Sequence, residues 1–182
     1  MSEMIRAALA CTLLLALAVP GPAHAAKRLE LALQDDPVFV DQRWMDREKA
    51  LDHAAALKSK RIRVNVIWSR THDFASLDAL QAAAAKRGIR LQLTLTGPAP
   101  AWATTNRKVG GHRPDPATFA AFARAVAAHF KGRVDRYSIW NEPNLSAWLS
   151  PAKTAPQRYR ALYRAGYKAI KTVDPKAQVL FG

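Results

Sequence analysis

Cysteine is almost absent from this sequence, and glycine and acidic residues are scarce. Cys11 is the only cysteine among the 182 residues, so a disulfide framework within the chain and a thiolate metal site are both excluded. Only 14 Asp and Glu residues oppose 28 Lys and Arg residues, which leaves a formal net charge of +14. With 8 glycines and 49% hydrophobic residues, the composition excludes a collagen-like or disordered chain and is typical of a globular domain.

The amino terminus has a hydrophobic run that is too short to cross a membrane. Ala7–Val19 spans 13 residues, whereas a transmembrane helix needs about 20. Arg6 precedes this run and the small-x-small sequence Ala23-His24-Ala25 follows it, which predicts a secretory signal peptide at residues 1–25 with cleavage near Ala25. The alternative, a lipid anchor on Cys11, is disfavoured because the apolar run continues after the cysteine. We therefore expect a secreted protein, extracellular or periplasmic, without a membrane anchor.

The basic charge belongs to the predicted mature chain, residues 26–182, because the signal peptide removes one charge of each sign, Glu3 and Arg6. A charge of this size favours nucleic acids or acidic polysaccharides as partners. The cations, however, are scattered before three predicted strands and along residues 158–171. This distribution is typical of a solvated outer surface, so we predict weak, salt-sensitive binding to polyanions and no specific nucleic-acid partner.

The mature sequence alternates short β-type runs with amphipathic helical patterns, which is typical of βα units around a parallel sheet. The five predicted strands are Leu29–Gln34, Ile62–Trp68, Ile89–Thr96, Val134–Trp140 and Gln178–Phe181. The four predicted helices lie at about Asp46–Lys58, from a cap at Ser76 to Gly88, from a cap at Asp115 to Gly132, and around Tyr159–Ile170. In the last of these the tyrosines share a face with Leu162 and Ile170, which favours core packing over a nucleic-acid stacking platform.

Polar and aromatic residues gather where the predicted strands end. Arg63 and Asn65 lie on one face of the second strand, where a buried parallel strand would ordinarily be apolar, so they need partners inside the fold. Ligand and catalytic groups of parallel α/β folds collect at the carboxyl ends of the strands. The segments that follow the first four strands are Gln34-Asp35-Asp36, Trp68 to His72, Thr96 to Ala103, and Trp140-Asn141-Glu142-Pro143-Asn144.

On these residues the sequence resembles the secreted (β/α)8-barrel glycoside hydrolases of clan A, the cellulase-like and β-xylosidase-like enzymes. The most specific mark is Trp140-Asn141-Glu142-Pro143 at the end of the fourth strand. Arg63, the Pro-Ala-Trp-Ala segment at 100–103 and a fifth strand at 179–182 support it. The resemblance covers the whole mature chain and implies an α/β fold, a partial TIM (β/α)8 barrel of about five strands and four helices that is truncated after strand five.

The resemblance also implies roles for individual residues. Glu142 would be the general acid/base, Asn141 would hydrogen-bond the sugar hydroxyl next to the scissile bond, and Arg63 would orient a carboxylate nucleophile. A carboxylic acid that donates a proton needs a raised pKa, which burial beside Trp140 and Pro143 could supply. The candidate substrate-binding residues are Trp68, Trp102, Trp140 and Asp35.

Structural explanations remain open for several of these residues. Arg63 could instead pair with Asp35 or Asp36, and Trp68 and Trp102 could serve core or rim packing rather than sugar stacking. His72 and His112 are interpreted as loop residues, because no His, Asp and Glu spacing indicates a metal site. We therefore expect no metal and no cofactor.

The sequence offers only one of the two carboxyl groups that glycoside hydrolysis usually requires. A full barrel takes about 250 residues, and the only acidic residue after Glu142 is Asp174. We considered a fragment of a longer product, an incomplete or frameshifted reading frame, and a half-barrel that pairs with a separate carboxyl-terminal half. The predicted function is a secreted glycoside hydrolase acting on a polysaccharide or oligosaccharide, and the alternative is a non-catalytic secreted protein that binds carbohydrate or polyanions.

Overall fold

The computed structural model describes residues 29–71 and 73–182. The predicted signal peptide and His72 lie outside the described residues, so the prediction of export is not addressed by the fold. Among the described residues, no helix is long and apolar enough to cross a membrane.

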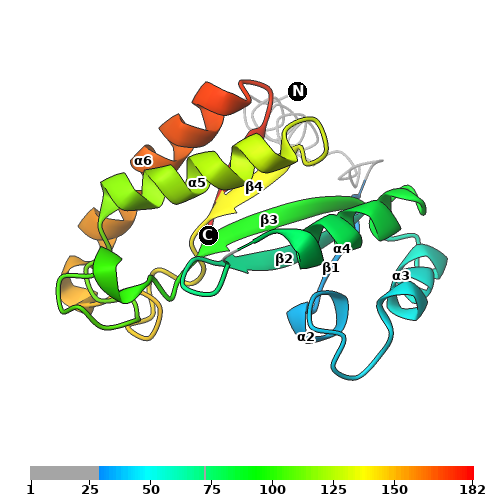
Figure 1. Ribbon diagram of the computed structural model, residues 1–182, viewed down its shortest axis with the longest axis horizontal. Helices are drawn as coiled ribbons and strands as arrows, with labels where there is room; N and C mark the ends of the chain where they lie inside the picture. Colours follow the sequence, from blue (N-terminus) through cyan, green and yellow to red (C-terminus); the bar gives the residue numbers. More distant parts are fainter. Residues whose placement is uncertain (1–28, 72) are drawn as a thin grey trace, which may run out of the picture.

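A single sheet of five parallel strands in sequential order, β1-β2-β3-β4-β5, forms the centre of the molecule (Figure 1). The strands are β1 (Ala32–Gln34), β2 (Arg61–Ile67), β3 (Arg90–Thr96), β4 (Arg136–Ile139) and β5 (Gln178–Phe181). The helices between them are α2 (Asp36–Phe39), α3 (Arg47–Ala56), α4 (Ala75–Ala85), α5 (Pro116–Phe130) and α6 (Ala155–Val173), with short 3-10 turns η1 (Ala101–Ala103) and η2 (Ala152–Thr154). This order confirms the predicted α/β partial barrel.

The two faces of the sheet differ in chemistry. Alternate strand residues pack under the helices and are almost completely buried; they include Ile62, Val64, Val66, Leu91, Leu93, Leu95, Tyr137 and Ile139. The residues between them, including Arg61, Arg63, Asn65, Thr94 and Ser138, lie on the opposite, inner face, because successive side chains of a strand point to opposite sides. The prediction that Arg63 and Asn65 face inward together is confirmed.

Helices α5 and α6 lie side by side (Figure 1), and α6 packs on β4 and β5. Gly166 of α6 permits this close packing, because a Cβ atom there would lie 2.9 Å from Phe119 and 3.0 Å from Ile139. The hydroxyls of Tyr159 and Tyr163 donate hydrogen bonds to the carbonyls of Ile139 and Val179. Tyr159 and Tyr163 therefore pack on the sheet, as the sequence predicted, whereas Tyr167 is 42% exposed.

Two helix starts differ from the sequence prediction. Helix α4 begins at Ala75 instead of after a cap at Ser76, and the Asp73 carboxylate accepts a hydrogen bond from the Ala75 backbone N–H at 3.0 Å. The short helix α2 follows β1 directly and was not predicted. The predicted cap at Asp115 is confirmed, since its carboxylate accepts the Thr118 N–H at 2.8 Å.

Candidate functional site

The Trp-Asn-Glu segment continues from β4 and lies at the carboxyl end of the sheet. The backbone N–H of Trp140 donates to the Leu95 carbonyl at 2.8 Å, which extends the pairing with β3 by one residue. Trp140 and Glu142 both have positive φ values, +69° and +43°. These conformations are uncommon for residues other than glycine and are enriched at functional sites. Asn141, between them, is thereby presented at the end of the strand.

On the inner face, Arg63 of β2 connects its own strand to β1, to β3 and to the segment after β4. Its guanidinium donates to Thr94 Oγ1 at 2.8 Å, to Gln34 Oε1 at 2.8 Å and to Asn141 Oδ1 at 3.1 Å. No carboxylate oxygen of Asp35 or Asp36 lies within 4.0 Å of the Arg63 guanidinium nitrogens, so neither acid forms an ion pair with it. Of the two readings that the sequence left open, the geometry therefore favours a positioning role at the strand ends over simple pairing with an acid.

Asn141 joins Arg63 to the candidate acid. Because the Asn141 carbonyl oxygen accepts from Arg63, its amide nitrogen is free to donate, and it lies 3.4 Å from Glu142 Oε2. This last contact is long for a hydrogen bond. Glu142 itself is exposed among the described residues. The burial that the sequence predicted for this carboxyl group is therefore not provided by Trp140 and Pro143.

Asp36 and Asn65 form a second polar pair at the same end of the sheet. The Asp36 carboxylate accepts the Asn65 backbone N–H at 2.9 Å and its side-chain amide at 2.6 Å. Burial raises the pKa of Asp36, and the two hydrogen bonds from Asn65 only partly oppose that effect. Asn65 Oδ1 is buried and has no hydrogen-bond partner in the described structure. An unsatisfied buried acceptor of this kind is costly unless a ligand or water reaches it.

A cavity of about 540 Å³ opens beside this pair. Its walls come from the segments after β1 and β2, with Trp148 from the loop after β4; they include Asp36, Asn65, Arg70, Thr71, Asp73 and Trp148. Polar groups beside an indole suit a hydroxylated ligand. The sequence singled out Asp36 as a rim residue that could contact substrate or Arg63, and Asn65 only for its inward position. Trp148 was not predicted.

The other predicted binding residues lie in different surroundings. Asp35 caps α2, with its carboxylate accepting the Val38 N–H at 3.2 Å. Trp68 is only 6% exposed and packs against Phe119 and Phe122 on the helix side of the sheet.

Trp140 is completely buried, and its indole N–H donates to the Trp148 carbonyl at 3.1 Å. Neither Trp68 nor Trp140 thus offers a ring face for a sugar, which corrects the sequence interpretation. Of the three predicted tryptophans, only Trp102, at 61% exposure, has an indole that a ligand could reach.

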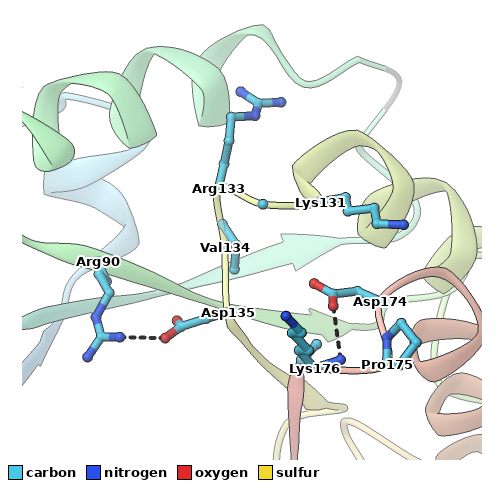
Figure 2. A pocket seen from close by; sticks show the side chains of 10 residues that line it. Arg90, Lys131, Arg133, Val134, Asp135, Asp174, Pro175 and Lys176 are labelled. Carbon is cyan, nitrogen blue, oxygen red and sulfur yellow. Dashed lines mark hydrogen bonds and ion pairs between the residues drawn. The ribbon is translucent and has the colours of Figure 1, made fainter.

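A second cavity, of about 590 Å³, lies at the opposite end of the strands, among the residues that precede β4 and β5. Figure 2 shows Arg90 paired with Asp135 at its edge, and Asp174 accepting the backbone N–H of Lys176. Active sites of parallel barrels occur at the carboxyl ends of the strands. We therefore place the candidate site at the end with Glu142. Within the described residues, no cluster of His, Cys, Asp and Glu could hold a metal ion.

Comparison with solved structures shows the same fold in glycoside hydrolases. A family 39 glycoside hydrolase from Bacteroides cellulosilyticus WH2 matches with a TM-score of 0.63 and 19% identity over 83% of this chain. A family 1 β-glucosidase from Thermotoga maritima has a TM-score of 0.60 at 16% identity over 74% of the chain. Endoglucanase Cel5A from Pseudomonas stutzeri, solved with cellobiose, has a TM-score of 0.54 at 22% identity over 72%.

The chain shares its fold with part of each of these proteins. It spans 31%, 36% and 40% of the lengths of these three proteins, respectively, so it corresponds to part of a (β/α)8 barrel. No protein-family model matches the sequence. A search of curated protein sequences finds no match either.

Proposed function

We propose that this chain is part of a secreted glycoside hydrolase that cleaves O-glycosyl bonds in a polysaccharide or oligosaccharide, with Glu142 as general acid/base. The observation that carries the proposal is the chain of contacts from Arg63 to Asn141 to Glu142 at the carboxyl end of a parallel sheet. The shared fold of several glycosidases supports it.

In this proposal Arg63 fixes the orientation of Asn141. Because the Asn141 carbonyl oxygen is engaged by the guanidinium, its amide must donate, either to Glu142 or to a sugar hydroxyl. Glu142 then donates a proton to the glycosidic oxygen as the bond breaks and later removes one from the attacking water. A bound sugar ring would cover the exposed Glu142 carboxyl group and exclude water from it.

The cavity beside Asp36 would receive part of the carbohydrate. A sugar hydroxyl donating to Asn65 Oδ1 would satisfy that buried acceptor, and Trp148 would contribute an apolar wall. Because Glu142 acts first as acid and then as base, the proposed mechanism is a retaining one, and the second carboxyl group, the nucleophile, should lie about 5–5.5 Å from Glu142. We propose that a part of the barrel not spanned by this chain supplies it, as a continuation of the polypeptide or a separate half.

A non-catalytic secreted protein that binds carbohydrate or polyanions is the second candidate. The exposure of Glu142 favours it, because a working general acid is usually shielded from water. The two candidates differ in their response to one substitution.

The test is hydrolysis of aryl glycosides by the longest product that the gene encodes, compared with its Glu142→Gln variant. Gln keeps the shape but cannot transfer the proton, so we expect activity to fall about 10²–10⁴-fold. Glu48→Gln, on the distant helix α3, is the matched control and should keep full activity. Sugar binding without any turnover by the wild-type product would favour the non-catalytic candidate.

The proposed export has its own test. Amino-terminal sequencing of the exported protein should find Ala26 as its first residue.

A further inference from the structure

Trp102 is a large exposed side chain with rigid support. Its ring meets Trp68 edge-on, with centroids 5.9 Å apart and an interplanar angle of 90°. Trp68 in turn stacks on Phe122 at 5.8 Å. Trp44 is also exposed but makes no aromatic contact within residues 29–71 and 73–182. The indole of Trp102 is therefore held by buried aromatic rings, as expected of a preformed binding surface.

Two hollows of about 270 Å³ each meet at Trp102. One is lined by apolar and hydroxyl side chains; it includes Ser69, Thr71, Pro100, Thr118 and Phe122. The other is lined by charged and hydroxyl side chains; it includes Thr104, Thr105, Arg107, Arg113 and Asp115. A ligand longer than one ring could thus extend across Trp102 from an apolar side to a charged side.

The charged hollow is cationic. The Arg113 guanidinium has no hydrogen bond or ion pair with any residue that the structure describes, and Arg107 makes only a 3.4 Å contact with the Trp102 carbonyl. The one carboxylate in the hollow, Asp115, accepts the Thr118 N–H of helix α5 with one oxygen and keeps its negative charge, so the lining carries two positive charges and one negative charge. Lys108 lies next to Arg107 in the same loop and is exposed, but it does not line the hollow.

The loop that carries these cations is fixed by backbone pairing. Ala99 and Gly110 exchange two hydrogen bonds of 2.8 and 3.0 Å, and the Arg113 N–H donates to the Ser150 carbonyl at 2.9 Å. Arg107 and Arg113 both have positive φ values, +54° and +45°. The two guanidinium groups are therefore attached to a defined backbone on one side of Trp102.

We propose that Trp102, Arg107 and Arg113 form a binding site for an acidic polysaccharide that carries uronic acid carboxylates. One pyranose ring would lie against the Trp102 indole, and a neighbouring carboxylate would accept hydrogen bonds from the two guanidinium groups, whose fork matches a planar carboxylate. The net charge of +14 attracts such a chain. Trp102 follows the carboxyl end of β3, and Thr71 lines both its apolar hollow and the cavity beside Asp36, so this site adjoins the candidate hydrolase site at the same end of the sheet.

Calorimetric titration with oligogalacturonate tests the proposal on the Glu142→Gln chain, so that binding is measured without hydrolysis. The fully methyl-esterified oligosaccharide has the same rings without the charges and should bind at least tenfold more weakly. Trp102→Ala should weaken oligogalacturonate binding about tenfold or more, with partial recovery in Trp102→Phe. Arg113→Gln should weaken it severalfold and flatten its salt dependence.

The matched controls are Trp44→Ala and Arg160→Gln, which change exposed residues elsewhere on the surface. Equal losses in the controls would overturn the proposal, because they would show binding to diffuse charge. Equal affinity for the methyl ester, or preference for a sulfated glycan or single-stranded DNA of the same charge, would also overturn it. These titrations are independent of the proposed hydrolase function, because every variant in them already carries Glu142→Gln and only binding is measured.

Discussion

The two ends of the sheet contain similar polar residues on the inner face but differ in how these are partnered. At the amino end, the wholly buried side chain of Arg61 donates to Glu30 at 2.9 Å, to Asp135 at 2.8 Å and to the Leu91 carbonyl at 2.9 Å. Arg90 and Arg136 complete this cluster by pairing with the same two acids. At the carboxyl end, Arg63 has only neutral partners.

On the inner face, the carboxyl end also has two buried polar atoms without a partner among the described residues, Asn65 Oδ1 and Thr96 Oγ1. The buried Tyr137 hydroxyl also lacks one, but it lies on the helix side of the sheet. We infer from this difference that the amino end contributes mainly to stability and the carboxyl end mainly to function. Charges that satisfy one another hold strands together, whereas groups without partners are available to a ligand. We therefore expect substitutions at the amino end to act on folding and those at the carboxyl end to act on binding and catalysis.

The largest expected effect on stability is that of Arg61→Met. Removing this guanidinium takes one hydrogen bond each from Glu30, Asp135 and the buried Leu91 carbonyl. The two acids are partly exposed and keep Arg136 and Arg90 as partners, so we expect a loss of about 2–4 kcal/mol, as for lost hydrogen bonds to charged groups. Urea unfolding of the chain measures the loss. Arg160→Met, on the exposed side of α6, is the control and should change stability by less than about 0.5 kcal/mol. If Arg61→Met lowers the free energy of unfolding no more than the control does, the Arg61 cluster does not stabilise the fold.

Arg63→Met should have a smaller effect on stability. Its three partners are neutral, and Thr94 Oγ1 keeps a hydrogen bond with Ser138 at 2.7 Å when the arginine is removed. We expect a loss of about 1–3 kcal/mol in the same unfolding experiment. Destabilisation equal to that of Arg61→Met would contradict the contrast between the two ends.

Acid should weaken the amino-end cluster. Burial alone would raise the pKa of Asp135, but the hydrogen bond from Arg61 and the charges of Arg61 and Arg90 outweigh it and lower the pKa. A lowered folded-state pKa stabilises the fold above the unfolded value, near 4 for a carboxyl group, and this contribution is lost as the pH falls through the folded value.

The urea midpoint of the wild-type chain should therefore decrease below about pH 4, and Asp135→Asn should show a shallower decrease. The raised pKa of Asp36 acts in the opposite direction, since its charged form is disfavoured in the fold. Identical slopes in Asp135→Asn and the wild type would refute the prediction.

Glu142→Gln should have the smallest effect on stability. The side chain is exposed, and its only hydrogen bond to a described residue is the long one from Asn141, at 3.4 Å. We expect a change within about 0.5 kcal/mol, as for most surface substitutions. A thermal unfolding midpoint well below that of the wild type would show that Glu142 has a structural role.

The strands and the inward direction of Arg63 and Asn65 were predictable from the sequence, because alternation along a strand fixes which residues share a face. The same alternation places Trp68 on the helix side with Val64 and Val66, so its burial could have been predicted as well. Trp140 could not have been, because its φ of +69° ends the alternation of β4 and turns the ring into the core.

The Asp36–Asn65 pair was missed for a related reason. It depends on α2 beginning immediately after β1, with Asp35 used as the cap and Asp36 left to reach Asn65. Arg107 and Arg113 were missed because they are charges in a loop without periodicity, and only the fold brings them to the side of Trp102.

The most direct test of the central claim is how the Glu142→Gln loss divides between two substrates of the longest gene product. An aryl glycoside with a good leaving group needs little protonation, so the variant should cleave its first bond almost normally and be slowed mainly in the later step, in which Glu142 activates water. A glycoside with a poor leaving group should lose about 10²–10⁴-fold in the first step. Equal, small losses on both substrates would contradict the account and show that Glu142 takes no part in proton transfer.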